Sequence, residues 1–371
     1  MSRVIDITQI VIGVVVVITI ADAALRTFVL PRPSGVTMSR AIAWAVRGVY
    51  EIVARPTKTY ESRDRVFATY GPITLLSFAV VWLAGLLVAF ALMYEALTAK
   101  NWFEAFRISG SALLTLGFAV PTSGAATVLV FIEAAAGLLL VALLIAYLPT
   151  IYSAFSRREV AVTRLSVRAG TPPTPLEMLV RAQRANFTDQ LDAVWREWEI
   201  WFVEIEESHT SLSILSFYRS PNPQRSWLTA AGAVLDAASI RMSTLDLPFS
   251  SNAGLCIRAG YLSLREVASH FGVAFDPDPD PNAPISVGRE EFMEVYDELA
   301  AAGVPVRPDR DEAWRAFKGW RVNYDAALIG LAELLDAPYA PWISDRSLAS
   351  GPTKLPIRSR PPLDERSQTI R

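Results

Sequence analysis

Three long and almost uncharged runs of apolar residues dominate the pattern of hydrophobic and polar positions along the chain. They extend from about Ile7 to Leu30, from Pro72 to Leu97 and from Ala125 to Phe155. Each run reaches the ~20 residues that a helix needs to cross the ~30 Å hydrocarbon layer of a bilayer. Because backbone polar groups find no water in that layer, we expect each run to be a membrane-spanning helix.

The pattern changes after about Thr174. Apolar residues now recur at helical spacing among abundant charged helix formers, most clearly from Pro175 to Ser208, which is typical of a soluble helical domain. We therefore predict an all-α integral membrane protein with four parts. These are an N-terminal membrane helix with a basic cytoplasmic loop (1–69), a two-helix region with a loop between its helices (70–159), an all-α cytoplasmic domain (174–343) and a disordered tail (344–371).

Composition supports a membrane part and excludes several classes of site. Hydrophobic residues make up 52% of the 371 residues and charged residues only 19%. The net charge of −2 gives no indication of a nucleic-acid partner. Cys256 is the single cysteine and only two histidines are present, so neither a disulfide framework nor a metal centre is expected. No nucleophile motif or phosphate-binding loop is evident, and we predict neither an enzyme nor a bound cofactor.

The distribution of basic residues predicts how the spans are oriented. Those of the loop between the first two spans are Arg32, Arg40, Arg47, Arg55, Lys58, Arg63 and Arg65, whereas the linker between the second and third spans has only Lys100 and Arg107. By the positive-inside rule the first loop and the C-terminal region are cytoplasmic, and the N-terminus lies outside the plasma membrane. An alternative is that the first run is a cleaved signal peptide ending at Ala21–Ala23, although its short N-terminal part has no net positive charge.

Two features of the N-terminal part have simple structural explanations. Asp22 and Arg26 are four residues apart near the inner end of the first span, which predicts a helical ion pair. The segment Ala41–Ala54 is amphipathic but too charged to span a membrane. It is either a helix lying along the cytoplasmic interface or a plain connecting helix.

The stretch "SGSALLTLGFAVPTSG" (Ser109–Gly124), between the second and third spans, is uncharged and unusually apolar for a loop in water. Asn101–Thr115 is long enough for a helix that descends partway into the membrane from outside, with its carbonyl end towards the bilayer centre. The carbonyl end of a helix carries a partial negative charge, which favours a cation beside it. The following residues then return to the surface, and a ring of their carbonyl groups around a shared axis can replace the hydration shell of an alkali cation.

These residues resemble the pore-loop potassium channel superfamily, over about Tyr70 to Glu159. The resemblance rests on "SALLTLGFAVP" followed by the third span and "FSRRE". It implies a homotetramer with a re-entrant pore helix, in which Thr115, Leu116, Gly117 and Phe118 match the Thr-Val-Gly-Tyr of the family's filter. It also implies that Gly137 is a bending point of the inner helix. The implied permeant ion is potassium.

The sequence departs from the family pattern directly after Phe118. The family continues with Gly-Asp, whereas this chain has Ala119 and Val120. A residue with a β-carbon adopts the left-handed backbone of such a glycine at a cost of ~1–2 kcal/mol. We therefore expect either a wider and less selective filter at Thr115–Ala119 or one that does not conduct.

Glu133 and Gly137 each have two interpretations. Glu133 is an intramembrane carboxylate, which normally faces the protein interior or a water-filled cavity. It either tunes cation occupancy or locks the third span to the pore helix through a hydrogen bond to Ser109, Ser111 or Arg107. Gly137 is either the hinge that the resemblance implies or a position of close helix packing.

The function predicted from these observations is passive monovalent cation conduction, regulated by the cytoplasmic domain. The alternative is a non-conducting membrane scaffold whose cytoplasmic domain binds an unidentified ligand or protein. Glu206, His209 and Asp236 are the candidates for an ion- or ligand-sensing site in that domain. A third hypothesis is an enzyme that uses His209 and nearby acidic residues. The simpler interpretation of this region is an amphipathic helix with a tryptophan-rich core face and solvated carboxylates.

Overall fold

The computed structural model of the chain describes residues 2–30, 37–98 and 101–345, and these residues are helical without a β-strand. A single bridge between Leu245 and Val306 is the only β-type pairing in the described ranges. The described chain divides into two compact units. The first unit comprises residues up to Ser156 together with Ser211–Arg219, and the second comprises Arg157–Thr210 and the described residues from Ser220 onward.

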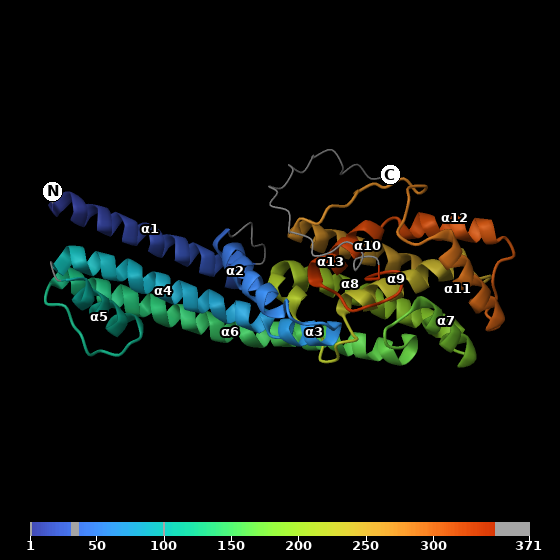
Figure 1. Cartoon of the computed structure of the whole chain (residues 1–371), viewed down its shortest axis with the longest axis horizontal. Helices are drawn as coiled ribbons and strands as arrows, with labels where there is room; N and C mark the ends of the chain where they lie inside the picture. The colour runs from blue at the N-terminus through green and yellow to red at the C-terminus, as the bar shows by residue number, and fades with distance from the viewer. Residues whose placement is uncertain (1, 31–36, 99–100, 346–371) are drawn as a thin grey trace. The chain divides into compact units, whose positions relative to one another are not determined.

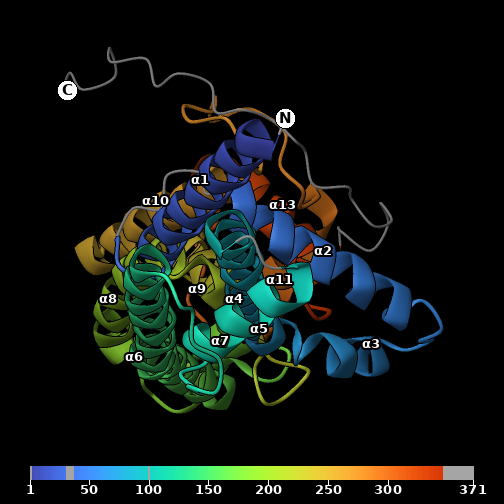
Figure 2. The same cartoon turned by 90° about the vertical axis from the view of Figure 1, so that its left-hand side faces the viewer.

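Three helices are long and apolar enough to cross a membrane, as the sequence predicts; all three begin in the first unit, and the third continues beyond Ser156 into the second. The elements of the first unit are α1 (Ser2–Phe28), α2 (Thr37–Ala54), α3 (Tyr60–Phe67), α4 (Tyr70–Thr98), α5 (Trp102–Leu113), the first part of α6 (Gly124–Ala169) and the 3₁₀ turn η2 (Ser213–Phe217). Figures 1 and 2 show α4 lying between α1 and α6, with α5 beside α4. The third predicted span runs to about Phe155, and the helix that contains it continues to Ala169 because the charged residues that follow are also good helix formers.

Small residues bring α1 and α4 close together. A β-carbon at Gly13 would lie 2.7 Å from the carbonyl oxygen of Ala89, and one at Gly85 would lie 2.7 Å from Ile20. Such contacts allow two apolar helices to associate in a bilayer, where no hydrophobic driving force brings them together. The predicted ion pair is also present, since Arg26 Nε lies 2.7 Å from Asp22 Oδ2.

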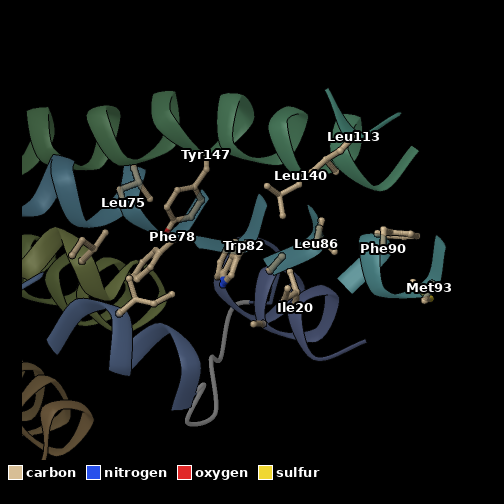
Figure 3. Close-up of a cluster of buried hydrophobic side chains, with 14 of the residues drawn as sticks. Ile20, Leu75, Phe78, Trp82, Leu86, Phe90, Met93, Leu113, Leu140 and Tyr147 are labelled. Carbon is tan, nitrogen blue, oxygen red and sulfur yellow. The ribbon is translucent and has the colours of Figure 1, made fainter. Parts of the chain in front are cut away.

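The core of the first unit is built around one face of α4. Phe78, Trp82, Leu86 and Phe90 recur every four residues along it and are all buried. Figure 3 shows this row between α1 and α6, with Tyr147 of α6 above Phe78 and Trp82. The row fixes α4 as the central helix, and α5 folds back against the part of it beyond Leu86.

The second unit is an all-helical bundle around α9. Its elements are the last part of α6, α7 (Pro175–Arg184), η1 (Thr188–Gln190), α8 (Leu191–Ser211), α9 (Trp227–Ser243), α10 (Ser251–Phe271), α11 (Arg289–Ala301), α12 (Arg310–Arg321) and α13 (Asp325–Leu335). All residues of α9 are buried, which its mostly small and apolar side chains permit. Ser226 begins this helix by accepting a hydrogen bond from the amide of Leu228.

A buried charged network ties the C-terminal helices to α9. The guanidinium of Arg321 is fully buried and forms ion pairs with Asp236 of α9 and with Asp325. It also donates to the carbonyl oxygen of Trp342, in the segment after α13. Burial alone would lower the pKa of Arg321, but the charges of Asp236 and Asp325 outweigh it and raise that pKa. The network therefore keeps Arg321 charged and holds the end of the described chain in place.

Residues Ser211–Arg219, which we call the strap, belong to the first unit although the residues on both sides of them belong to the second. Arg219 lies 3.3 Å from Asp64 and donates to the hydroxyl of Tyr60. The ring of Phe217 meets that of Tyr70 edge-on with centroids 5.5 Å apart. The local sequence pattern predicts these residues within the 174–343 domain, because it carries no sign of contacts with residues so distant along the chain. Residues 346–371, the greater part of the predicted disordered tail, lie outside the described residues.

Candidate functional site

The helix α5 begins the candidate site and is positioned by its first turn. The side chain of Asn101 accepts a hydrogen bond from the amide of Glu104 at 3.0 Å, which starts the helix. The helix ends at Leu113, so Thr115, which the sequence analysis included in it, lies in the following loop. Its buried residues are Ala105, Ile108, Ser109, Ser111, Ala112 and Leu113.

Two contacts show how far α5 reaches along its neighbours. Ser109 Oγ donates to the carbonyl oxygen of Leu87 at 2.9 Å, and Leu87 lies eleven residues before the end of α4. At 1.5 Å per residue this corresponds to about 16 Å along α4. The end of α5 meets α6 at Gly137, where a β-carbon would lie 2.6 Å from the carbonyl oxygen of Leu113. Gly137 is thirteen residues into α6, or about 20 Å from its start.

Glu133 joins three helices of the first unit. Its carboxylate accepts hydrogen bonds from Ser109 Oγ of α5 at 2.5 Å and from the hydroxyl of Tyr94 of α4 at 2.8 Å. The Glu133 side chain is fully buried. Ser109 is one of the three partners expected for a locking role, and Tyr94 is a partner that the sequence analysis did not identify. The carboxylate is thus enclosed by protein groups and fixes α6 to both α4 and α5.

The loop after α5 directs its amide groups back to that helix. The amides of Leu116 and Gly117 donate to the carbonyl oxygen of Ser111 at 2.8 and 3.3 Å. The amide of Ala119 donates to Ser111 Oγ at 3.0 Å. Ser111 is therefore the anchor of the loop, a role that the sequence analysis missed. The sequence feature that could have indicated this role is the position of Ser111 within an otherwise apolar helix end.

The carbonyl groups of Thr115–Ala119 have the opposite arrangement. Within the described residues, no hydrogen-bond donor pairs with any of these five carbonyl oxygens. The amides of Leu116, Gly117 and Ala119 are bound to Ser111, whereas the carbonyls remain available to water, to a cation or to another chain.

The backbone of the loop is left-handed at two positions. Thr115 has a φ of 54° and Gly117 a φ of 72°. Gly117 adopts this region without penalty, whereas a β-branched residue such as Thr115 is an outlier there and stores strain. Ala119 is not among the described residues with positive φ. The cost anticipated for a β-carbon at Ala119 is therefore not incurred, and the strained position is Thr115 instead.

The side chains of the loop are mostly apolar and face outward. Leu114, Leu116, Phe118 and Val120 are 56%, 60%, 59% and 68% exposed in the single chain. The guanidinium of Arg107 lies 5.9 Å from the centre of the Phe118 ring. Four neighbouring apolar side chains with this exposure form a patch that is suited to lipid or to a protein partner.

The close contact at Gly137 agrees with the packing interpretation of this residue. The helix α6 runs without interruption through Gly137, from Gly124 to Ala169. Whether Gly137 also acts as a hinge stays a prediction.

The candidates in the second unit have separate partners. His209 is fully buried, with Nε2 3.2 Å from an Arg158 nitrogen and Nδ1 3.0 Å from Ser208 Oγ. Asp236 belongs to the Arg321 network, and Glu206 is half-buried. Among the described residues no group of three His, Cys, Asp or Glu side chains could hold a metal ion. His209 is thus paired with Arg158 and Ser208, and Asp236 with Arg321, so the two candidates have different hydrogen-bond partners.

Burial lowers the pKa of His209 well below its ordinary value, and the charge of Arg158 lowers it further. Burial also raises the pKa of Glu206, with a contribution from Glu266. The His209 imidazole is therefore neutral at physiological pH and serves as a packed, hydrogen-bonded core group.

Comparison of the chain with protein-family models, with curated proteins and with solved structures gives no match.

Proposed function

We propose that the chain assembles as a homotetramer around a shared axis and passes monovalent cations, potassium among them, through the loop Thr115–Ala119. In this proposal α5 is a re-entrant pore helix and α1, α4 and α6 cross the plasma membrane. The second unit is cytoplasmic and regulates the pore.

The observation that carries the proposal is the unpaired state of the five loop carbonyls. The α5 contacts with Leu87 and Gly137 put the start of the loop about 16–20 Å along two helices that can span a bilayer. That is more than half of a ~30 Å hydrocarbon layer. Backbone carbonyls without partners at this depth are tolerated only beside a water-filled path or protein. A ring of them is suited to coordinate a dehydrated alkali cation.

The strain at Thr115 supports the same proposal. Backbone strain persists only where the surrounding structure enforces it, and it clusters at functional sites. Here the amides of the next residues, Leu116 and Gly117, bind Ser111 and force the chain to turn sharply at Thr115. After this turn the amides of Leu116, Gly117 and Ala119 bind Ser111 of α5, and the carbonyl oxygens of the loop have no such partner.

The test is cation flux through the purified full-length protein in potassium-loaded liposomes. We expect potassium efflux from vesicles of the natural sequence and none with Gly117→Asp, which places a side chain and a charge at a left-handed position. Gly124→Ala is the matched control, because Gly124 has no positive φ and open space around it. Efflux that survives Gly117→Asp would show that ions take another route.

Selectivity and assembly give two further measurements. Since Ala119 does not have the left-handed backbone expected for the family's second filter glycine, we expect sodium to pass within about tenfold of potassium, a difference of at most ~1.4 kcal/mol. Native mass spectrometry is expected to give a tetramer. A monomer or dimer in lipid would exclude a shared axis.

A non-conducting scaffold is the second candidate, and the exposed apolar patch favours it. Leu114, Leu116, Phe118 and Val120 could pack between copies of the chain and close the axis. A stable tetramer that passes neither potassium nor sodium would support the scaffold function over cation conduction.

A further inference from the structure

The helix α2 has one face that is packed within the first unit. Ile42 and Ala54 are buried, and the ring of Tyr50 lies 5.5 Å from that of Tyr70. The hydroxyl of Tyr70 donates to the carbonyl oxygen of Ala43 at 3.2 Å. Because Tyr70 is the first residue of α4, this contact places α2 beside one end of a helix that can span the membrane.

The other face of α2 is apolar and uncovered. Trp44, Val49, Ile52 and Val53 are 48%, 59%, 60% and 55% exposed. They lie at helical spacing with Ala45 and Gly48, which are also exposed. The result is an apolar stripe about three turns long, which we call the α2 stripe. Nothing in the described part of the chain covers it.

Basic side chains flank the α2 stripe. Arg40 precedes it, Arg55 and Lys58 follow it, and all three are exposed. Within the described ranges these three form no ion pair, whereas the acidic Glu51 is paired with Arg47. The exposed charge next to the stripe is therefore predominantly positive.

We propose that the α2 stripe docks on the surface of an anionic bilayer, with its apolar side chains among the acyl chains and Arg40, Arg55 and Lys58 on acidic phospholipid headgroups. Charge complementarity selects this occupant, because a helix with one apolar face and basic flanks binds an anionic interface. The position of α2 favours the same occupant, since α2 packs against the first residue of α4, a helix that can span the membrane. A tryptophan such as Trp44 is the side chain typical of that interface.

This inference does not depend on whether the protein conducts ions. It extends the interfacial alternative for Ala41–Ala54 by naming the lipid class and the side chains that recognise it. It requires only that α4 crosses the bilayer, which its length and composition allow.

A spin label at residue 52 tests the proposal in the full-length protein. Cys256 is the single cysteine and is buried, so a label on Ile52→Cys reports from one position. The protein is placed in nanodiscs of phosphatidylcholine alone or with one-third phosphatidylglycerol. Collisions of the label with oxygen and with a water-soluble nickel chelate are then measured. Leu262→Cys is the control, because Leu262 is an exposed apolar residue of α10 in the second unit.

We expect the residue-52 label to become oxygen-accessible and nickel-protected in the anionic discs, and the residue-262 label to remain nickel-accessible. Each basic side chain near an anionic surface changes the ratio of inserted to free helix by about fivefold. Replacing Arg40, Arg55 and Lys58 by Gln should therefore lower this ratio by about 100-fold. High ionic strength should have a similar effect on the natural sequence.

Three results would overturn the proposal. A nickel-accessible label in both lipids would show that the stripe faces water. Protection from both oxygen and nickel would show that protein, such as a second copy of the chain, covers it. Equal insertion in neutral and anionic discs, unchanged by the three Gln substitutions, would show that acidic headgroups are not recognised.

Discussion

Glu133 shows how a single residue can hold the membrane part of this fold together. It accepts two hydroxyl hydrogen bonds, from Tyr94 of α4 and Ser109 of α5, in a site closed to solvent. A buried polar group that loses its partner costs about 1–3 kcal/mol, more than the net gain from making the bond. The stability of the three-helix junction therefore depends on both hydroxyls.

We expect Tyr94→Phe and Ser109→Ala each to lower the free energy of unfolding by about 1–3 kcal/mol, and the double variant to lower it by less than the sum. Thermal unfolding of the protein in detergent provides the measurement. Tyr152→Phe is the control, because Tyr152 is 70% exposed and its substitution should change stability by less than ~0.5 kcal/mol. If the double variant lost as much stability as the two single variants together, the two hydroxyls would act on separate groups.

Gly137→Ala tests the contact between α6 and the end of α5. The new methyl group would lie 2.6 Å from a backbone oxygen of Leu113, which cannot move away as a flexible side chain could. We expect a loss of about 1–3 kcal/mol in stability, because overpacking a tight contact forces the backbone to shift. Gly124→Ala has open space and should be neutral or slightly stabilising. An unchanged melting temperature for Gly137→Ala would show that the two helices separate easily.

At the scale of elements, the sequence predicts the membrane helices well and the loop between them only in part. Runs of apolar residues fix the existence of α1, α4 and α6, because length and hydropathy alone determine whether a helix can span a bilayer. The helical start at Asn101 follows from its capping side chain. The left-handed turn at Thr115 could not be predicted, since threonine avoids that region and only the bonds to Ser111 impose it.

The strap could not be predicted either. Its contacts with Asp64 and Gly71 join residues about 150 positions apart, and neither hydropathy nor spacing encodes such pairings. The Arg321 network was missed for the same reason. Its carboxylates stand on α9 and α13, and in the sequence each looks like an ordinary charged helix residue.

Gly71→Ala is expected to loosen the strap. A β-carbon at this position would lie 2.5 Å from the ring of Tyr218, which has to swing aside to admit it. The bond after Arg219 should then become more accessible, and we expect trypsin to cut there about tenfold faster in the intact protein, as for a loss of ~1.4 kcal/mol in local stability. Gly48→Ala, which meets nothing within 4 Å, is the matched control. Equal cleavage rates would show that Tyr218 does not hold the strap in place.

At the scale of the whole molecule, the buried His209 makes stability depend on pH. The folded protein keeps this imidazole neutral, because burial and the charge of Arg158 lower its pKa. The unfolded chain binds a proton near pH 6.5. Below that pH the unfolded state therefore holds one more proton than the folded state, and the free energy of unfolding falls as the pH is lowered.

Thermal unfolding of the full-length protein between pH 7.5 and 5.0 measures this effect. We expect His209→Gln, which retains a hydrogen-bond acceptor for Arg158, to lose part of the decline towards low pH. His270→Gln should show the same pH dependence as the natural sequence, because His270 is exposed. If both variants gave identical curves, His209 would not be the group responsible.

The strap also has a topological consequence. Because Ser211–Arg219 belongs to one unit and its neighbours to the other, the polypeptide passes between the units three times, after Ser156, after Thr210 and after Arg219. No single truncation can therefore release the bundle around α9 as an intact piece. A fragment starting at Arg157 would carry nine residues whose packing partners had been deleted. The two units are therefore linked by three peptide connections rather than by one.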